Sequence, residues 1–189
     1  MIDMAAFDHF AFACQDLDEG VTRVESLTGV QAAPGGPHPG VGTHNALLSL
    51  GSNVYLEIIA VDPTQADPPR PRPFGIDEHR GPRLAAFAIH PSEGETIESV
   101  AETIRNHGTD PGPVVAMSRV KPDGEEISWR LTLSNNQRMV PFVIDWGDTP
   151  NPATITPKGC LLTEVRGSDP QLDRTVALHQ QLGLNIKVS

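Results

Sequence analysis

Apolar residues alternate with small or polar residues in several short runs of this chain, a pattern typical of β-strands with one buried face. The first run spans residues 7–14, where Phe10 and Phe12 occupy even positions while His9 and two alanines occupy odd positions. Successive side chains of a strand point to opposite faces. We therefore expect the two phenylalanines to pack against a helix, and His9 to lie on the other face, where the small alanines leave space.

A helix and a β-hairpin are predicted to follow this strand. Asp16 is a favourable N-cap, and apolar residues recur at helical spacing over 17–27. Two further alternating runs, 43–50 and 54–61, are separated by a Gly-Ser-Asn turn, which predicts a hairpin. Between the helix and the hairpin, residues 34–42 contain four glycines and three prolines, and we expect no regular structure there.

The same order of elements recurs in the second half of the chain. Aligning Phe12 with Phe87 places the sequence AFAC over AFAI. The repeated unit then predicts a strand, a helix and three strands at 84–89, 95–107, 114–117, 127–133 and 140–145. A third copy begins with a strand at 160–165 and a helix that ends near Leu182, and it stops after one short strand. Repetition of one supersecondary unit predicts an α+β fold of paired βαβββ modules with a partial third βα unit.

We therefore divide the chain into a first module at 5–62, a loop or linker at 63–83, a second module at 84–146 and a partial third unit at 158–189 packed on the same domain. The linker is rich in Pro and Arg and is long for a connection inside a compact domain. The strand of the third unit must pair with an existing sheet edge, in its own chain or in a neighbouring chain.

The charge of the chain narrows its possible partners. It carries 14 Lys and Arg against 24 Asp and Glu, a formal net charge of −10. So few cations cannot neutralise a row of phosphates, and we expect no nucleic acid and no membrane among the partners. The N-terminus does not resemble a signal peptide and no run approaches membrane-spanning length, so we expect a cytoplasmic protein. Cys14 and Cys160 form no CxxC pair and are expected to be small buried residues.

His9 and Glu57 are the first candidates for chemistry because each lies in the middle of an apolar strand. By strand alternation both face away from the expected helix, and Tyr55 shares the face of Glu57. A His nitrogen and a carboxylate oxygen suit a borderline divalent ion such as Zn, Fe, Mn, Ni or Co. Two ligands do not complete a metal site, and a hydrogen bond between His9 and Glu57 in a semi-buried cleft is the alternative interpretation.

The glycine-rich segment 35–45 supplies the next candidates, His38, His44 and Asn45. Such a segment can lie against a ligand and offer backbone N–H groups to its oxygen atoms. Strand parity favours Asn45 over His44 as the residue that faces a cavity. We expect His38, His44, Asn45 and Tyr55 to contact a substrate, and an ordinary loop with solvated histidines is the alternative.

Three segments, FDHFAFACQDLD, GGPHPGVGTHNALLSLG and VYLEIIAVDP, together resemble the glyoxalase-like proteins of the vicinal oxygen chelate superfamily. The resemblance is strongest over 5–62, continues to about 146 and returns over 160–185. It implies two modules side by side in a cupped mixed sheet, with helices on the outer face and a divalent metal in the cup. It also implies that His9 and Glu57 are metal ligands and that Glu57, when displaced, moves protons as the catalytic residue. Members of the superfamily commonly build dimers through sheet edges, so the resemblance favours a homodimer.

The second module departs from the pattern that the resemblance implies. The strand alignment puts Leu84 at the place of His9 and Val143 at the place of Glu57, with Asp145 on the same face. A standard set of four ligands is therefore not encoded. A metal would need other side chains, water or the substrate to complete its coordination.

The resemblance implies two competing functions. In the first, the chain binds a small oxygenated molecule in a cupped cleft and carries out metal-dependent lyase, isomerase or dioxygenase chemistry. In the second, the same cleft binds or sequesters a small molecule without catalysis, as drug-resistance members of the superfamily do. The missing ligands favour the second function, whereas the buried polar pair favours the first, because apolar pockets avoid unpaired charge. A purely structural or interaction module is a third possibility.

Overall fold

The computed structural model describes residues 7–51, 53–121, 124–133 and 139–189. Its first half runs through β1 (Phe7–Ala13), α1 (Leu17–Thr28), β2 (Ala33–His38), β3 (Thr43–Ser49) and β4 (Tyr55–Val61). The short 3₁₀ helix η1 (Pro73–Gly75) precedes a second half with β5 (Arg83–Ile89), α2 (Ile97–Asn106), β6 (Val114–Val120), β7 (Glu126–Thr132) and β8 (Phe142–Asp145). The chain ends with η2 (Pro152–Thr154), β9 (Val165–Gly167), α3 (Leu172–Gln181) and β10 (Ile186–Val188).

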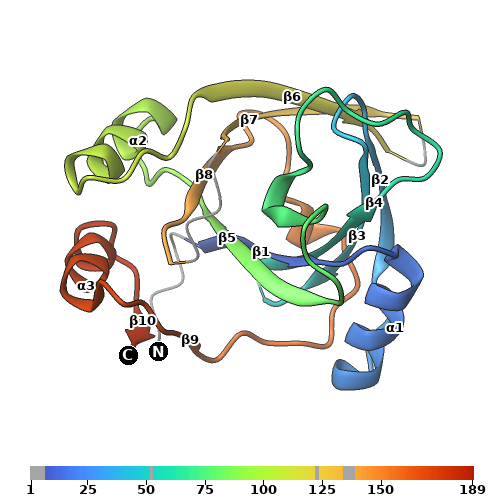
Figure 1. The fold of residues 1–189 in the computed structure, drawn as a ribbon, viewed down its shortest axis with the longest axis horizontal. Coiled ribbons are helices and arrows are strands. Elements are labelled where there is room, and N and C mark those ends of the chain that lie inside the picture. The colour runs from blue at the N-terminus through green and yellow to red at the C-terminus, as the bar shows by residue number, and fades with distance from the viewer. Residues whose placement is uncertain (1–6, 52, 122–123, 134–138) are drawn as a thin grey trace.

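Eight strands of the described residues form one mixed sheet in the order β2-β3-β4-β1-β5-β8-β7-β6. The first strand of each half pairs in parallel with the last strand of that half, and β1 and β5 join the halves as an antiparallel pair. Figure 1 shows the sheet bent into a cup, with the three labelled α-helices outside it. The predicted α+β class and the repeated βαβββ order are confirmed.

The helices begin where the sequence predicts caps. The Asp16 side chain accepts a hydrogen bond of 2.9 Å from the backbone N–H of Glu19, and Gly29 ends α1 in the left-handed conformation that glycine favours. Thr96 and Ser99 form a capping box at the start of α2. Each helix buries its apolar stripe on the convex face of the sheet.

The phenylalanines of β1 pack as expected. Phe10 lies in a core cluster with Ile97, Val100 and Ile104 of α2, while Phe12 packs against the cluster that contains Val24 of α1. His9 lies on the opposite face, where it stacks on Tyr55 of the neighbouring strand. We call this concave face, which carries His9, Tyr55 and Glu57, the inner face.

The absence of regular structure predicted for 34–42 is wrong for the first part of that segment. Strand β2 pairs with β3 in antiparallel register, with Gly36 opposite Asn45 and His38 opposite Thr43. Because β2 lies at the end of the sheet order, one side of the strand needs no ladder, and proline is tolerated there. The register shifts between Pro34 and Gly36, where the pairing is interrupted.

The strand predicted at 160–165 is also wrong in its extent. Strand β9 begins at Val165 and pairs in parallel with β10 of the same chain. Before it, the backbone N–H of Leu162 donates to the Leu50 carbonyl at 2.8 Å, and the Leu162 side chain packs on the core. Leu161, the residue before it, is 74% exposed. This stretch is anchored by that contact and by side-chain packing, not by a strand ladder.

The two ends of the curved sheet approach each other, so that the cup is nearly closed. Arg119 of β6 donates a hydrogen bond through Nη1 to the carbonyl of Gly35 in β2. A Cβ atom on Gly36 would lie 3.0 Å from the Val120 carbonyl oxygen, which shows how close the two backbones are. In the part of the chain that the structure describes, no helix combines the length and the apolar character that crossing a bilayer requires.

Candidate functional site

His9 is held in one orientation by the residue that precedes it. Its Nδ1 lies 2.6 Å from Asp8 Oδ1, and both side chains are buried. Asp8 Oδ2 accepts two more hydrogen bonds, from Trp146 Nε1 at 3.1 Å and from Asn151 Nδ2 at 2.9 Å. A carboxylate with these partners acts as an acceptor, so His9 carries its proton on Nδ1 and presents the lone pair of Nε2.

Glu57 lies directly beside His9 because β1 and β4 are parallel neighbours, with Ala11 opposite Glu57 in the register. Glu57 Oε2 is 3.7 Å from His9 Nε2, the approach that strand alternation predicts. Glu57 Oε1 accepts a hydrogen bond of 2.7 Å from Asn45 Nδ2. The carboxylate is 8% exposed, so one oxygen is anchored while the other faces the His9 ring.

His38 approaches Glu57 from the other side. Its Nδ1 is 2.9 Å from the Thr43 hydroxyl, and its Nε2 is 3.2 Å from Asn45 Nδ2 and 3.8 Å from Glu57 Oε1. Burial lowers the pKa of His38 below its ordinary value, although the charge of Glu57 opposes this shift. A neutral His38 that donates from Nδ1 to Thr43 carries its lone pair on Nε2, where it accepts from Asn45 Nδ2.

Of the four residues predicted to contact a substrate, three lie beside His9 and Glu57 and one does not. His38, Asn45 and Tyr55 join His9 and Glu57, and we call these five residues the inner polar cluster. The Tyr55 ring stacks on His9 with centroids 4.7 Å apart, and burial raises the pKa of its hydroxyl well above the ordinary value. The structure does not bring His44 into the cluster. His44 is the neighbour of Asn45 in β3, so its side chain lies on the other face of the sheet, where it pairs with Ala60 of β4.

The second half supplies apolar walls to the cluster. The edge of Phe142 meets His9, with ring centroids 5.2 Å apart, and the edge of Trp129 meets His38 at 6.3 Å. These side chains belong to a core cluster with Ala88 and Ile144. The inner face of this half therefore carries aromatic and aliphatic groups where the first half carries His and Glu.

The alignment that placed Val143 at the position of Glu57 is wrong. Leu84 is 60% exposed, and Val143 is fully buried among the residues that pack against α2. Asp145 is likewise bound outside the cluster, by Arg130 Nη2 at 2.8 Å. Phe142 and Ile144 of β8 lie in the inner cluster with Ala88, so the alignment without gaps is one residue out of phase at Val143.

The donor atoms suit a divalent ion in two respects. The separations of 3.7 Å and 3.8 Å from Glu57 to the two Nε2 atoms are below the span of about 4.2 Å that two ligands at 2.1 Å from one ion can reach. Both imidazoles are also held at Nδ1, by Asp8 and by Thr43, as metal-binding histidines are. No three His, Cys, Asp or Glu of the described residues already surround one point, so an ion would need side-chain rotation or oxygen ligands from outside.

Asn45 is the least satisfied member of the cluster. Its Nδ2 serves Glu57 and His38, but its Oδ1 is buried and no described residue forms a hydrogen bond with it. A Cβ atom on Gly35 would collide with this oxygen, so the glycine makes room for the amide. A buried acceptor without a partner costs about 1–3 kcal/mol, which an incoming donor or cation would relieve.

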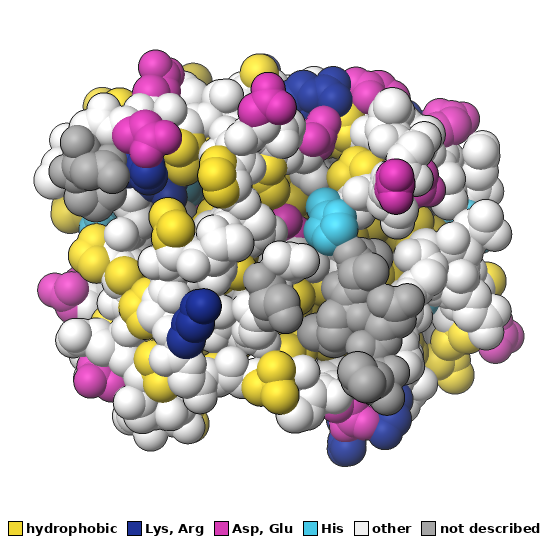
Figure 2. Space-filling model, turned by 180° about the vertical axis from the view of Figure 1, so that it is seen from behind, with side chains coloured by type: hydrophobic (Ala, Val, Ile, Leu, Met, Phe, Trp, Pro, Cys, Tyr) yellow, Lys and Arg dark blue, Asp and Glu magenta, His cyan; other side chains and the backbone are white. Residues whose placement is uncertain are grey.

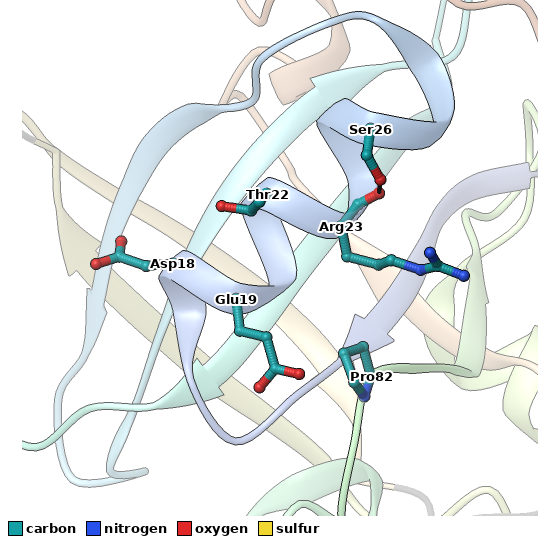
Figure 3. Close-up of a pocket in the computed structure, with 6 residues that line it drawn as sticks. All are labelled: Asp18, Glu19, Thr22, Arg23, Ser26 and Pro82. Carbon is teal, nitrogen blue, oxygen red and sulfur yellow. Dashed lines mark hydrogen bonds between the residues drawn. The ribbon is translucent and has the colours of Figure 1, made fainter.

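Two open hollows lie elsewhere on the molecule. One, of about 650 Å³, is lined by side chains along α1 and by Pro82 across from them (Figure 3). Another, of about 400 Å³, borders Trp129 and Trp146. On the face shown in Figure 2, acidic side chains are spread around the rim, while His, acidic and hydrophobic side chains meet near the middle. The hollow on α1 shares no residue with the inner polar cluster and carries no candidate chemistry.

Cysteine chemistry is not supported by the structure. Cys14 is buried on the side of α1, and burial raises the pKa of its thiol to about 12. Such a thiol is not ionised near neutral pH and is a poor nucleophile. Cys14 is therefore a small buried residue, as predicted, whereas Cys160 is half-buried.

Asp8 and Arg119 are members of the site that the sequence analysis missed. Strand alternation sends Asp8 to the face opposite His9, but the register shifts between Phe7 and His9 and lets the two side chains meet. Arg119 lies beyond the predicted end of the strand 114–117, which continues to Val120. Arg119 is two residues after Met117, so strand alternation places both side chains on the same face, and this spacing could have identified Arg119 as an inner residue.

Comparison with known proteins agrees with this fold. A family model described as a glyoxalase-like domain matches residues 7–183. No curated protein matches the chain. Among solved structures, a hypothetical protein from Staphylococcus aureus is 18% identical, with a TM-score of 0.66 over 93% of this chain and 74% of that one. Methylmalonyl-CoA epimerase from Mycobacterium tuberculosis is 18% identical, with a TM-score of 0.40 over 66% of this chain and 77% of that one. With the family model matched over most of its length, the chain belongs to the glyoxalase-like domain family.

Proposed function

We propose that the chain binds a small oxygenated molecule on the inner face of its sheet and activates it with His9 and Glu57 around a divalent metal ion. The observation that carries this proposal is the approach of His9 Nε2 to Glu57 Oε2, at 3.7 Å, with Asp8 fixing the His9 ring from behind. His38 is the nearest further ligand. The donor set suits Zn, Fe, Mn, Ni or Co, and lyase, isomerase and dioxygenase chemistry belong to this class of site.

The protein groups divide the work of such a reaction. A bound metal ion would polarise a substrate oxygen as a Lewis acid. Asn45 anchors Glu57 Oε1, which leaves Oε2 placed to take a proton from the substrate as a general base. Tyr55 keeps its proton because its pKa is raised, so its hydroxyl can serve as a hydrogen-bond donor. Phe142 and Trp129 cover the His rings and exclude water from them.

A second candidate function is the binding or sequestration of a small molecule without catalysis. The inner face of the second half favours it, because Ala88, Phe142 and Ile144 supply no metal ligand there. Turnover separates the two candidates. A catalyst consumes its ligand in the presence of the metal, whereas a sequestering protein returns it unchanged after denaturation.

Metal binding tests the first candidate directly. We expect isothermal titration of protein purified without a His tag, stripped with chelator and titrated with Mn²⁺ or Zn²⁺, to show one site per chain. His9→Gln and Glu57→Gln should each weaken binding by about 100-fold or more, since a lost ligand costs at least as much as a lost outer partner.

His44→Gln is the matched control for these variants. It removes a histidine from the adjacent strand region without touching the inner polar cluster, and its metal affinity should stay within about two-fold of the unmodified protein. Equal affinity in all variants, or no binding by the unmodified chain, would contradict the metal-dependent function.

Three further predictions remain proposals. We propose that the chain consists of a first module at 5–62, a linker at 63–83, a second module at 84–146 and a partial third unit at 158–189. We also propose that the protein acts in the cytoplasm and forms a homodimer. Sedimentation of the full chain and of a chain ending at 157 tests the last point. If both chains sediment with the same number of subunits per particle, the third unit does not build the dimer.

A further inference from the structure

Arg119 is buried on the inner face, and no carboxylate of the described residues forms an ion pair with it. It is 5% exposed, and it is the one buried cationic side chain among the described Lys and Arg residues. Its position follows from strand phase, since it continues the inward series of Met117 and lies opposite Ile127 in the register. A buried guanidinium normally pairs with an acid or a phosphate.

The hydrogen bonds of Arg119 leave most of its donors unused. A guanidinium carries five N–H donors, and in the described residues its one hydrogen bond runs from Nη1 to the Gly35 carbonyl. Other described cations form ion pairs, such as Arg130 with Glu98 and Asp145. One nitrogen of the Arg119 guanidinium is therefore bound to the backbone, and its remaining N–H groups are available to a ligand.

Arg119 belongs electrostatically to the inner polar cluster. Its charge acts on His38 and Tyr55, while Glu57 and Tyr55 act on it in return. Burial lowers its pKa, but an arginine stays protonated at any physiological pH. Glu57 does not neutralise it by contact, because Oε1 is bonded to Asn45 and Oε2 faces His9.

We infer that Arg119 binds a carboxylate of the ligand, so that the molecule taken by the inner face is a small carboxylic acid with an apolar body. The cation supplies paired N–H donors that match a carboxylate, and Trp129 and Phe142 supply an apolar wall at the same face. The Gly35 carbonyl orients the guanidinium without satisfying its charge. This inference rests on the proposed function, since the ligand acid lies beside His9 and Glu57.

The experiment compares acids with their neutral amides. Salicylate and salicylamide, mandelate and mandelamide, and lactate and lactamide are titrated calorimetrically into the full chain supplied with Mn²⁺. We expect at least one acid to bind about 10-fold or more tightly than its amide. Arg119→Gln should remove that preference by weakening the acid while leaving the amide within about two-fold.

Three further variants make the result specific. Arg130→Gln removes an arginine that faces outward on the adjacent strand, and should leave the preference unchanged. Arg119→Lys retains a cation and should keep part of the preference, which tests the idea even if Arg119→Gln fails to fold. Glu57→Ala should abolish binding of acid and amide alike, because it removes the centre of the site.

The outcomes separate this inference from the function on which it rests. Equal binding of every acid and its amide, lost together in Glu57→Ala, overturns the role of Arg119 and leaves the proposed function standing. A preference for acids that persists in Arg119→Gln also overturns it. Binding of no acid and no amide by the unmodified chain overturns both.

Discussion

Replacement of Asp8 by asparagine should change the proton position on His9 and thereby the site. Asp8 is fully buried and accepts hydrogen bonds from His9, Trp146 and Asn151. An asparagine of the same shape keeps one oxygen for Trp146 and Asn151 and turns its NH₂ towards His9 Nδ1. Since Nδ1 must then accept, the His9 proton moves to Nε2, and the lone pair that faces Glu57 is lost.

The magnitude follows from the three hydrogen bonds. Each loses about 1 kcal/mol when its acceptor changes from a charged to a neutral group, so Asp8→Asn should lower the free energy of unfolding by about 2–3 kcal/mol after the relief of desolvation. Loss of an outer partner of a metal-binding histidine weakens metal affinity by about 10–100-fold. We expect the second effect to exceed what the loss of stability alone would cause in a chain that remains folded.

Two measurements, made beside the calorimetric titration with Mn²⁺, separate these effects. Urea unfolding followed by tryptophan fluorescence gives the stability, and ¹⁵N NMR of the imidazole nitrogens gives the protonated atom of His9. Asn151→Ala is the control, because it removes one donor to Asp8 without altering the His9 contact. It should lower stability and leave metal affinity unchanged. An Asp8→Asn protein that still carries its His9 proton on Nδ1 and binds Mn²⁺ as tightly as the unmodified chain would refute the reasoning.

Three other perturbations have defined outcomes. Gly35→Ala should drive the amide of Asn45 from its place, at a cost of about 1–3 kcal/mol in unfolding free energy and with weaker Mn²⁺ binding; calorimetry that shows full affinity would contradict the contact. Burial lowers the pKa of His179 below 6.5, so the unfolded chain takes up the proton first and the free energy of unfolding falls as the pH drops below 6.5. His179→Gln should make that fall smaller in urea titrations between about pH 7 and 5. An unchanged pH dependence would exclude this role. Leu162→Ala should cost about 1–2 kcal/mol because its side chain packs on the core, whereas Leu161→Ser should cost almost nothing at 74% exposure; equal thermal shifts would show that the side-chain placement is wrong.

The part of the site that the sequence predicts is the part that depends on strand phase alone. His9, Asn45 and Glu57 each occupy one position of an alternating run, and pairing of β1 with β4 brings them together. The residues that it does not predict depend on irregular backbone. Asp8 reaches His9 through a register shift, and no alternating pattern contains that shift.

The fold was predictable in its order of elements and less so in its registers. Pro and Gly in β2 indicated a loop, yet an edge strand needs one ladder only, which such residues permit. Val143 was assigned to the inner face by an alignment without gaps, and its burial against α2 shows that the phase differs by one residue. An alignment that is wrong by one position assigns every side chain of the strand to the wrong face. Residues that pack against the helix are then mistaken for residues of the inner face.

The unequal contribution of the two halves has a consequence for how such a protein can change. His9, His38, Asn45 and Glu57 all come from β1–β4, whereas the apolar walls come from β7 and β8. A substitution in a wall can reshape the space beside the reactive groups without removing any of them. Duplicated modules that have diverged in this way can acquire new ligands through one copy while the other copy preserves the chemistry.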